Sequence, residues 1–364
     1  MTQTIVLTTG GSGGHIFPAQ SVAAELIKKG FKVVFITDNR GNTFQNLPEV
    51  ETYRLAAESV TGRSVFGKVI ALFKLWLGSV QAMRLLIKLK PTLVVGFGGY
   101  ASLPAVISAQ MLKIPCILHE QNAILGRANR VGAKKVRLIA TSFPHVERVS
   151  KNIPTVHVGQ PVRAPILERA NTPMPNNDTF NVLVFGGSQG AHFFSEHIPN
   201  VLMKLPPEYR AKIELTQQAR PEDEEMVKKA YENAGFKSLT IAPFFKNMPD
   251  LLSNAHLIIG RGGAGTLTEV MVVGRPAIII PLPSAADNHQ VANAKELEKV
   301  GGGWVVEQKD FDGDKLTTQL KTFMDHPEML KEVAAKAHSL AIVNAAERMA
   351  DIIQDIVKGT QNDN

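Results

Sequence analysis

The sequence predicts an α/β protein with two domains, each built on a doubly wound parallel sheet. Three features predict this class. Short apolar segments alternate with helix-like segments from the start of the chain, as in βαβ units. The chain has 364 residues, a length at which one hydrophobic core usually gives way to two. An apolar segment that runs into a glycine-rich turn occurs near the N-terminus and again near the middle, so two Rossmann-like domains are expected.

The first domain begins with a strand over 5–9 that runs directly into the turn 10–15, Gly-Gly-Ser-Gly-Gly-His. A helix over 18–29 and a strand over 31–37 complete the first βαβ unit. The uncharged stretch 91–112 is long enough to suggest a membrane span. It contains Gly96, Gly98, Gly99 and Pro104, which favour a strand, a turn and a helix.

The second domain repeats this order after a polar, proline-bearing stretch, 171–178. A strand over 182–185 leads into the turn 186–192, Gly-Gly-Ser-Gln-Gly-Ala-His. A strand over 255–259 leads into a third glycine-rich turn, 260–269. The chain is expected to pass from one domain to the other near residues 159–163.

These turns carry the first indication of chemistry. A glycine-rich turn before a helix presents backbone N–H groups and a positive dipole end, which favours a phosphate. Glu269, one turn into the helix after the third turn, is placed to accept hydrogen bonds from ribose hydroxyls. The polar run 287–290 is placed to meet sugar hydroxyls at the carboxyl end of the sheet. Asp38, which ends the second strand, keeps an NAD-dependent enzyme as an alternative.

Positive charge is concentrated in the first half of the chain. Between Ser59 and Val146, twelve Lys or Arg residues face one acidic residue, Glu120, while the whole chain carries a net charge of +7. Such a field suits an anionic surface or substrate. A nucleic-acid-binding module would also explain the charge, but it would not need three phosphate turns at strand ends, so no nucleic acid is expected.

The segment 62–77 forms an amphipathic helix with more apolar surface than one buried face requires. At helical spacing, one stripe holds Phe66, Ile70, Phe73 and Leu77, and a neighbouring stripe holds Val69, Leu72 and Trp76. The segment is either an ordinary core helix or a patch that enters the headgroup region of an anionic membrane.

Several motifs together resemble the family of peptidoglycan GlcNAc transferases called MurG. They are Gly10 to His15, Gly98-Gly99-Tyr100 with Ser102, His119-Glu120-Gln121-Asn122, Pro161-Val162-Arg163, Gly186 to Gly190 and Gly260 to Glu269. The resemblance covers nearly the whole chain. It implies the GT-B architecture, two Rossmann-like domains facing a deep cleft, with domains over 1–162 and 163–341 and a C-terminal helix, 342–364, on the first.

The resemblance also implies the substrates: UDP-GlcNAc and undecaprenyl-pyrophosphoryl-MurNAc-pentapeptide. The positions that match substrate-binding motifs are Ser12, Gly13, Gly14, Asn122, Arg163, Ser188, Phe245, Ala264, Gly265, Thr266, Leu267, Thr268, Glu269 and Gln290. The sequence departs from the family pattern at Gln160, where asparagine is common, and at Asn288-His289.

Three residues are candidates for catalysis. His15 is the expected base that takes the acceptor proton, because histidine needs little perturbation to act near neutral pH. His119 and Glu120 are the alternative bases. Either could instead position the acceptor, Glu120 could orient His15, and a purely structural hydrogen-bonding role is the further alternative for both. The reaction expected is an inverting displacement in which helix N-termini, Ser188 and Arg163 stabilise the leaving diphosphate.

No metal or cofactor is expected. The acidic run 310–314 imitates a calcium loop, but Lys315 and Lys321 stand where an EF-hand needs glycine and glutamate. Capping of the helix that begins near Lys315 is the expected role of this run.

The N-terminal residues lack the charged segment of a signal peptide, so a cytoplasmic protein is expected, peripheral on the inner face of the bacterial plasma membrane. Its membrane contact is expected at Phe66, Ile70, Phe73 and Trp76. A non-hydrolysing UDP-GlcNAc epimerase is the alternative function, since it shares the fold and the donor but needs no lipid acceptor.

Overall fold

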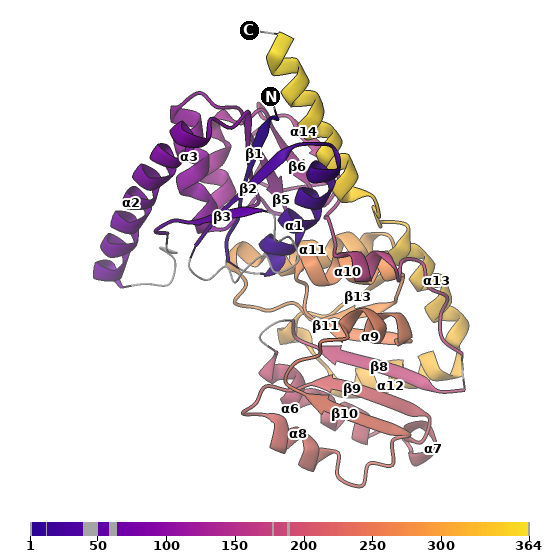
Figure 1. Cartoon of the computed structure of the whole chain (residues 1–364). Coiled ribbons are helices and arrows are strands. Elements are labelled where there is room, and N and C mark those ends of the chain that lie inside the picture. Colours follow the sequence, from indigo (N-terminus) through magenta and orange to yellow (C-terminus); the bar gives the residue numbers. More distant parts are fainter. Residues whose placement is uncertain are drawn as a thin grey trace. The chain divides into compact units, whose positions relative to one another are not determined.

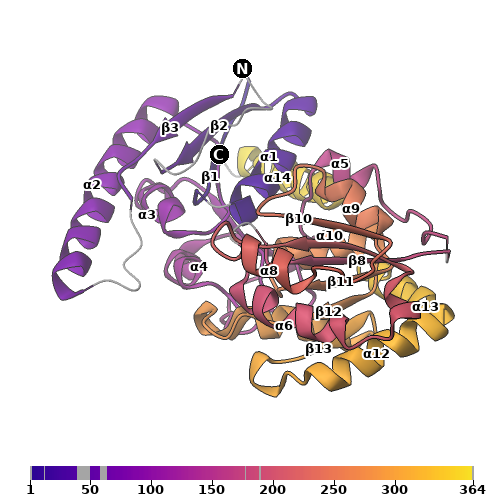
Figure 2. The ribbon, with the colours of Figure 1, turned by 90° about the horizontal axis from the view of Figure 1, so that it is seen from below.

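The computed structural model describes residues 2–11, 13–38, 50–57, 64–176, 178–187 and 190–362, without the side chains of Val65, Lys68 and 360–362. The chain divides into two compact units: Met1–Arg163 with Ile342–Asn364, and Ala164–Ala341. Each unit holds one parallel sheet with helices on both faces (Figure 1; Figure 2). The predicted class of two Rossmann-like domains is confirmed.

The first domain is built on a seven-stranded sheet of the order β3-β2-β1-β4-β5-β6-β7. The strands are β1 (Thr4–Thr8), β2 (Lys32–Thr37), β3 (Glu51–Arg54), β4 (Leu93–Gly96), β5 (Cys116–Glu120), β6 (Leu138–Thr141) and β7 (Thr155–His157). In the central ladder Val6 pairs with Val34 on one side and Val94 on the other. The strand order reverses direction between β1 and β4, and open α/β sheets bind ligands at the carboxyl end of such a point.

Alternate residues of β1 face opposite sides of this sheet. Ile5 and Leu7 belong to the core under α1 (Gly13–Lys28) and α14 (Ala345–Asn362). Val6 belongs to the core under α2 (Val65–Leu89) and α3 (Leu103–Met111). Figure 1 shows these two helix pairs on opposite sides of the sheet. Short elements complete the domain: η1 (Tyr100–Ser102), α4 (Arg127–Gly132) and η2 (Ala133–Lys135).

Helix α1 begins at Gly13, five residues before the start predicted at Pro18. A proline removes one backbone hydrogen bond from a helix, which is why Pro18 was expected at the first position. Burial of Ala19 and Val22 against the sheet holds the helix despite this loss. The earlier start is important because it places His15 in the first helical turn.

Helix α2 has the predicted apolar face, and the side chains of that face are exposed to solvent instead of packing in the core. Its N-cap is Ser64, whose Oγ accepts from the N–H of Gly67 over 3.3 Å. Among the α2 side chains that the structure describes, the fully buried ones are Ala71, Ala82 and Leu86. The exposed apolar side chains are Phe66, Val69, Ile70, Leu72, Phe73, Trp76, Leu77 and Ile87. The core-helix interpretation of this segment is therefore wrong.

Within the described part of the chain, the stretch Val69–Leu89 of α2 is the one helical segment whose length and composition would permit it to cross a membrane. Its mean hydropathy over an 18-residue window is 1.5. A single such helix is weak support for a span, because amphipathic helices of globular domains meet the same criterion.

The second domain is built on a six-stranded sheet of the order β10-β9-β8-β11-β12-β13. The strands are β8 (Phe180–Phe185), β9 (Ile213–Gln218), β10 (Ser238–Ala242), β11 (Leu257–Gly260), β12 (Ala277–Ile279) and β13 (Gly303–Val305). The reversal of strand order lies between β8 and β11. The second and third glycine-rich turns follow these two strands, so both lie at the ligand-binding edge of this sheet.

Helices cover both faces of the second sheet. Val182 and Val184 belong to the core with α6 (His192–Met203), α8 (Glu224–Ala230) and α12 (Gly313–Asp325). Figure 1 places α9 (Met248–Asn254) and α10 (Ala264–Val273) over the other face. The remaining elements are α5 (Ala164–Leu167), α7 (Pro207–Arg210), η3 (Ala286–Asn288), α11 (His289–Lys299), η4 (Gln308–Asp310) and α13 (Pro327–His338).

Candidate active site

In the first domain, two glycine loops hold His15 at the carboxyl edge of β1 and β4. The N–H of Gly10 donates to the carbonyl of Gly98 over 3.0 Å and joins the loops. Gly99 has a φ of +76°, and a Cβ there would lie 2.9 Å from the Cα of Gly10 and 3.4 Å from the His15 ring. Only glycine meets both conditions, so the loops pack directly against the half-buried imidazole.

The His15 ring is the first member of a chain of polar contacts. Its Nδ1 lies 3.2 Å from Oε1 of Gln121. The Nε2 of Gln121 donates to the carbonyl of Phe97 over 2.8 Å and lies 3.2 Å from Nδ1 of His119. The Nε2 of His119 lies 3.2 Å from the carbonyl of Gly159. His119 is fully buried, and this desolvation lowers its pKa to about 4, so the ring is neutral at physiological pH.

Glu120 holds the loop that follows β5. Its Oε1 accepts from the backbone N–H and the side-chain amide of Asn122, over 2.9 and 3.1 Å. Its Oε2 accepts from the N–H of Gly126 over 2.9 Å and from the amide of Asn129 over 2.7 Å. The carboxylate is buried and meets four donors, which is an arrangement that fixes a loop. Of the three catalytic candidates, only His15 is accessible.

Arg163 lies beside the helix that carries His15. Its guanidinium is 4.8 Å from the centre of the Phe17 ring, a cation–π contact. Ser21, one turn further along α1, donates to the carbonyl of Val162 over 2.9 Å. These two contacts place the charge of Arg163 near the N-terminal half of α1.

In the second domain, Gln218 connects two loops at the carboxyl edge. Its Oε1 accepts from the N–H of Gly186 in the second glycine-rich turn, and its Nε2 donates to the carbonyl of Pro243, each over 3.0 Å. The two aromatic residues that follow Pro243 differ in their exposure to solvent. Phe244 is 62% exposed, whereas Phe245, the predicted donor contact, is half-buried.

Arg261, which belongs to the third glycine-rich turn, holds the turn in place through buried contacts. The side chain is 7% exposed and lies over the ring of Phe194 at 4.9 Å. Its Nη1 donates to the carbonyl of Ile280 over 3.0 Å and to Oε1 of Gln308 over 3.1 Å. Burial lowers its pKa to about 10, so the guanidinium remains charged at physiological pH.

Two amide side chains of α11 hold Gly262 in the same turn. Gln290 Oε1 accepts from the N–H of Gly262 over 3.1 Å and from the N–H of Leu282 over 2.9 Å. The amide of Asn293 donates to the carbonyl of Gly262 over 3.1 Å. Gln290 was predicted to contact the donor. Because its oxygen is committed to the backbone, only its Nε2 can serve a ligand.

The first two turns of α10 contain six of the fourteen predicted substrate-binding residues, Ala264 to Glu269. Leu267 is fully buried, and its N–H donates to the carbonyl of Gly263. Thr268 is also buried, and its hydroxyl donates to the carbonyl of Ala264 over 2.9 Å. The side chain of Leu267 therefore packs inside the domain, and that of Thr268 is bonded to the helix backbone. The accessible members are half-buried: Gly265, Thr266 and Glu269.

The polar run before α11 has an unusual backbone. Asp287 and Asn288 have φ values of +55° and +60°, a left-handed backbone conformation that residues other than glycine rarely adopt. Consecutive residues of this kind are typical of ligand-binding loops, where the surrounding structure holds the strain. The turn leads directly into Gln290 and therefore helps to set its position.

The other predicted residues are placed as follows. Ser12 and Ser188 lie outside the described residues. Gly13 and Gly14 form the exposed start of α1, and Asn122 is tied to Glu120. Asp38, the basis of the NAD alternative, is buried.

The acidic run 310–314 caps a helix as predicted. Oδ1 of Asp312 accepts from the N–H groups of Asp314 and Lys315 over 2.9 and 3.1 Å, at the start of α12. Among the described residues, no group of three or more His, Cys, Asp or Glu side chains is arranged to hold a metal ion.

Sequence reasoning gave no role to Gln121, Gln218, Arg261 or Asn293. Gln121 follows a buried strand and Gln218 ends one, and a polar side chain at such a position was the signal available for both. Asn293 and Arg261 carried no local signal, because their partners are distant in sequence.

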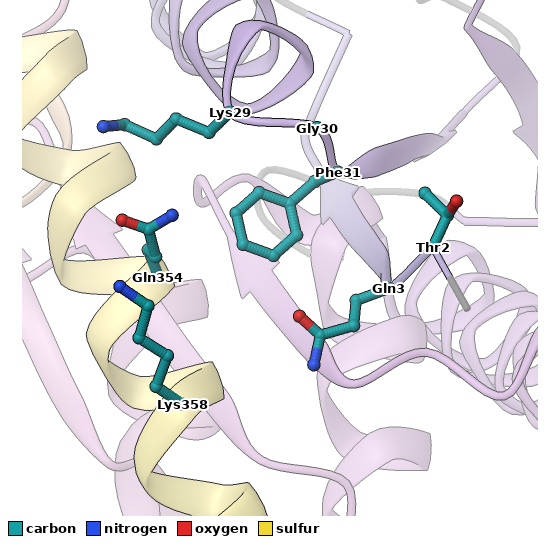
Figure 3. A pocket seen from close by; sticks show the side chains of 7 residues that line it. All are labelled: Thr2, Gln3, Lys29, Gly30, Phe31, Gln354 and Lys358. Atoms are coloured by element: carbon teal, nitrogen blue, oxygen red, sulfur yellow. The ribbon is translucent and has the colours of Figure 1, made fainter.

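A cavity of about 200 Å³ lies at the opposite, amino-terminal edge of the first sheet (Figure 3). It is lined by Thr2, Gln3, Lys29, Gly30, Phe31, Gln354 and Lys358. Lys29 in its rim pairs with Asp351 of α14 over 2.6 Å. The cavity shares no residue with the site built from the glycine turns and belongs to the junction of α1 with α14.

Comparison with known families identifies both domains. Residues 5–141 match the glycosyltransferase family 28 N-terminal domain, and residues 181–356 match the glycosyltransferase family 28 C-terminal domain.

Two relatives carry the name UDP-N-acetylglucosamine–N-acetylmuramyl-(pentapeptide) pyrophosphoryl-undecaprenol N-acetylglucosamine transferase. The protein of Rhodospirillum rubrum is 44% identical over 96% of this chain and 91% of its own length. That of Paramagnetospirillum magneticum is 42% identical over 97% of this chain and 96% of its own length.

Solved structures agree. The crystal structure of Acinetobacter baumannii MurG matches with a TM-score of 0.78 and 30% identity, over 98% of this chain and all of that one. A UDP-GlcNAc 2-epimerase from Neisseria meningitidis bound to UDP-GlcNAc matches over 97% of this chain and all of that one, with a TM-score of 0.69 at 13% identity, a likeness of fold alone.

The resemblance inferred from the motifs is thus confirmed over nearly the full length. The chain belongs to glycosyltransferase family 28 and, within it, to the MurG family of peptidoglycan GlcNAc transferases.

Proposed function

We infer that this enzyme transfers GlcNAc from UDP-GlcNAc to the MurNAc sugar of undecaprenyl-pyrophosphoryl-MurNAc-pentapeptide during peptidoglycan synthesis. The observation that carries the inference is the 44% identity, over 96% of the chain, to a transferase whose name states this reaction.

The chemistry is a direct displacement at the anomeric carbon. The acceptor hydroxyl oxygen forms a bond to C1 of GlcNAc while the bond between C1 and the β-phosphate oxygen breaks, and the electron pair leaves with UDP. Attack opposite the leaving group inverts the configuration. The step needs a base for the hydroxyl proton and donors for the charge that develops on the diphosphate.

His15 is the proposed base. It is the accessible member of the three candidates, and imidazole exchanges a proton readily near neutral pH. We assign positioning roles to His119 and Glu120, because both side chains are buried and bonded within the loop that supports His15.

The N-terminus of α10 is the proposed site for the diphosphate. The first N–H groups of a helix have no partner within it and carry the positive end of its dipole. Arg261, Gln290 and Asn293 hold the preceding turn in place for this task. Ser188 and Arg163 remain proposals for additional phosphate contacts, and Gly13, Gly14, Asn122 and Phe245 for other substrate contacts.

The decisive experiment incubates the protein with UDP-GlcNAc, with and without a lipid-pyrophosphate acceptor. Release of UDP with formation of a disaccharide only when the acceptor is present supports the proposal. Conversion to UDP-ManNAc without acceptor would identify an epimerase. That alternative shares the fold at 13% identity, whereas the transferases of Rhodospirillum rubrum and Paramagnetospirillum magneticum share 44% and 42%.

Glu269→Ala is expected to raise the KM for UDP-GlcNAc about tenfold with little change in kcat. Hydrogen bonds from a carboxylate to ribose hydroxyls change little between the ground and transition states. Initial rates at varied donor concentration measure both constants. Glu225→Ala, on the exposed face of α8, is the matched control with the same change of charge. A collapse of kcat with an intact KM would show that Glu269 has a different role.

EDTA treatment is expected to leave turnover intact. Helix N–H groups and arginine provide the charge stabilisation that Mg²⁺ provides in other nucleotide enzymes. The measurement compares rates before and after dialysis against EDTA, with MgCl₂ or MnCl₂ added back. Loss of activity restored by either ion would overturn this mechanism.

We also propose that the enzyme is peripheral on the cytoplasmic face of the bacterial plasma membrane, bound through α2. Phe73 and Trp76 are each 61% exposed, and their rings stack 5.8 Å apart. Basic residues dominate the surrounding sequence, which favours anionic lipid. A substrate anchored in the bilayer by a polyprenyl chain would be reached from such a surface.

A further inference from the structure

In the series of hydrogen bonds that links His15, Gln121 and His119, two backbone carbonyls determine which atoms donate and which accept. One end is the backbone carbonyl of Phe97 and the other is that of Gly159, 2.8 and 3.2 Å from Gln121 Nε2 and His119 Nε2. A carbonyl oxygen only accepts hydrogen bonds. The atom that contacts each carbonyl must therefore be a donor. This fixes which nitrogen and oxygen atoms of Gln121, His119 and His15 carry a proton.

The amide of Gln121 is oriented by Phe97. Since the carbonyl needs a donor, the NH₂ group faces Phe97 and the amide oxygen faces His15. The two hydrogens of this NH₂ group then have two acceptors, the carbonyl of Phe97 and the Nδ1 of His119, 3.2 Å away. The reversed amide would place oxygen against oxygen at Phe97.

The ring of His119 is oriented by Gly159. Its Nε2 carries the proton and donates to this carbonyl, so in the neutral ring Nδ1 is bare and accepts from Gln121. The ring stays neutral because burial lowers its pKa to about 4. Ser142 Oγ, 3.5 Å from His119 Nε2, is at the limit of hydrogen bonding and does not alter this assignment.

The same logic extends to the catalytic ring. Gln121 Oε1 accepts only, so Nδ1 of His15 must donate the bond that spans 3.2 Å. We propose that Gln121 and His119 are positioning residues that fix His15 in its Nδ1–H tautomer, which puts the basic lone pair on Nε2. Use of that lone pair to deprotonate the acceptor rests on the proposed function, whereas the tautomer itself does not.

The packing around the ring supports a fixed orientation. A Cβ at Gly98 would lie 3.4 Å from both Gln121 Oε1 and His15 Cε1, so the glycine leaves room for the contact between them. Gly98 has a φ of +81°. A relay of this kind parallels the carboxylate that orients a catalytic histidine in hydrolases, with a neutral amide in its place.

The test is the ring ¹⁵N spectrum of the full-length protein labelled with [¹⁵N]histidine. At neutral pH, His15 is expected to show a protonated, pyrrole-type Nδ1 and a bare, pyridine-type Nε2. His119 is expected to show the opposite pattern. The signals of His15 are assigned by their loss in His15→Gln. A bare Nδ1 at His15, or a mixture of both tautomers, would overturn the proposal.

A variant tests the role of Gln121 itself. Gln121→Met keeps the size of the side chain and removes both hydrogen-bonding groups. His15 is then expected to populate both tautomers, and kcat to fall at least ~10-fold with the KM for UDP-GlcNAc unchanged. Ser142→Ala, which leaves Gly159 and Gln121 in place, is the matched control and should keep the tautomer and kcat.

The outcomes separate the two proposals. If Gln121→Met leaves the His15 tautomer unchanged, Gln121 does not determine it and the relay is wrong. If the wild-type spectrum shows the predicted tautomer but His15→Ala remains active, the relay stands and the assignment of the base fails. The wild-type spectrum decides the tautomer even if Gln121→Met does not fold.

Discussion

His15→Ala is expected to lower kcat ~10²-fold or more while the KM for UDP-GlcNAc stays close to its original value. Removing a general base typically costs this much, because the proton must then pass to water. His15 lies in the first turn of α1 and its ring contacts the loop glycines and Gln121, so its loss should leave the donor contacts in the second domain intact.

The measurement is steady-state kinetics with a soluble acceptor analogue at varied donor concentration. His145→Ala is the matched control, because this exposed histidine of the same domain lies outside the polar chain. Turnover close to normal in His15→Ala would show that another group takes the acceptor proton.

The double substitution Phe73→Glu with Trp76→Glu is expected to abolish binding to anionic vesicles. Transfer of each exposed ring to an apolar environment is worth about 1.5 kcal/mol or more, so the pair accounts for about a hundredfold in partitioning. The two added carboxylates would further repel an anionic surface. Turnover of a soluble acceptor analogue should persist, since neither side chain belongs to the site.

Co-sedimentation with vesicles of anionic and neutral lipid, at low and high salt, measures this effect. Met226→Glu with Leu239→Glu is the matched control: these side chains of the second domain are 43% and 40% exposed, and the change of charge is the same. Unchanged binding in the α2 variant, or equally strong binding to neutral lipid at low salt, would place the membrane contact elsewhere.

The sequence predicted the fold well because its signals are local. Apolar strands that run into glycine-rich turns identified β1, β8 and β11, which border the points where the strand order of each sheet reverses in the structure. The start of α1 was predicted too late, because Pro18 is a strong local signal for a helix start. The helix starts earlier, at Gly13, because it packs against the sheet. That contact joins residues far apart in the sequence, so a short stretch of sequence does not reveal it.

The site was predicted less completely, because its contacts are remote in sequence. Gln121 meets His15 across 106 positions, and His119 meets Gly159 across 40. Gln290 was predicted to contact the donor, yet its oxygen accepts from two backbone N–H groups, contacts that no spacing rule predicts. Motifs predict which residues take part, whereas the hydrogen bonds of the structure show which of their polar atoms are already engaged.

The packing of α14 on α1 affects the order in which the protein matures on the ribosome. Met349, Ile353 and Val357 of α14 are fully buried in the core of the first domain. During translation the whole of Ala164–Ala341 is made before they emerge, which at ~5–20 residues per second takes roughly 10 to 35 seconds. For that interval the apolar surface of α1 lacks its cover and is open to chaperones. The domain that begins first is therefore completed last.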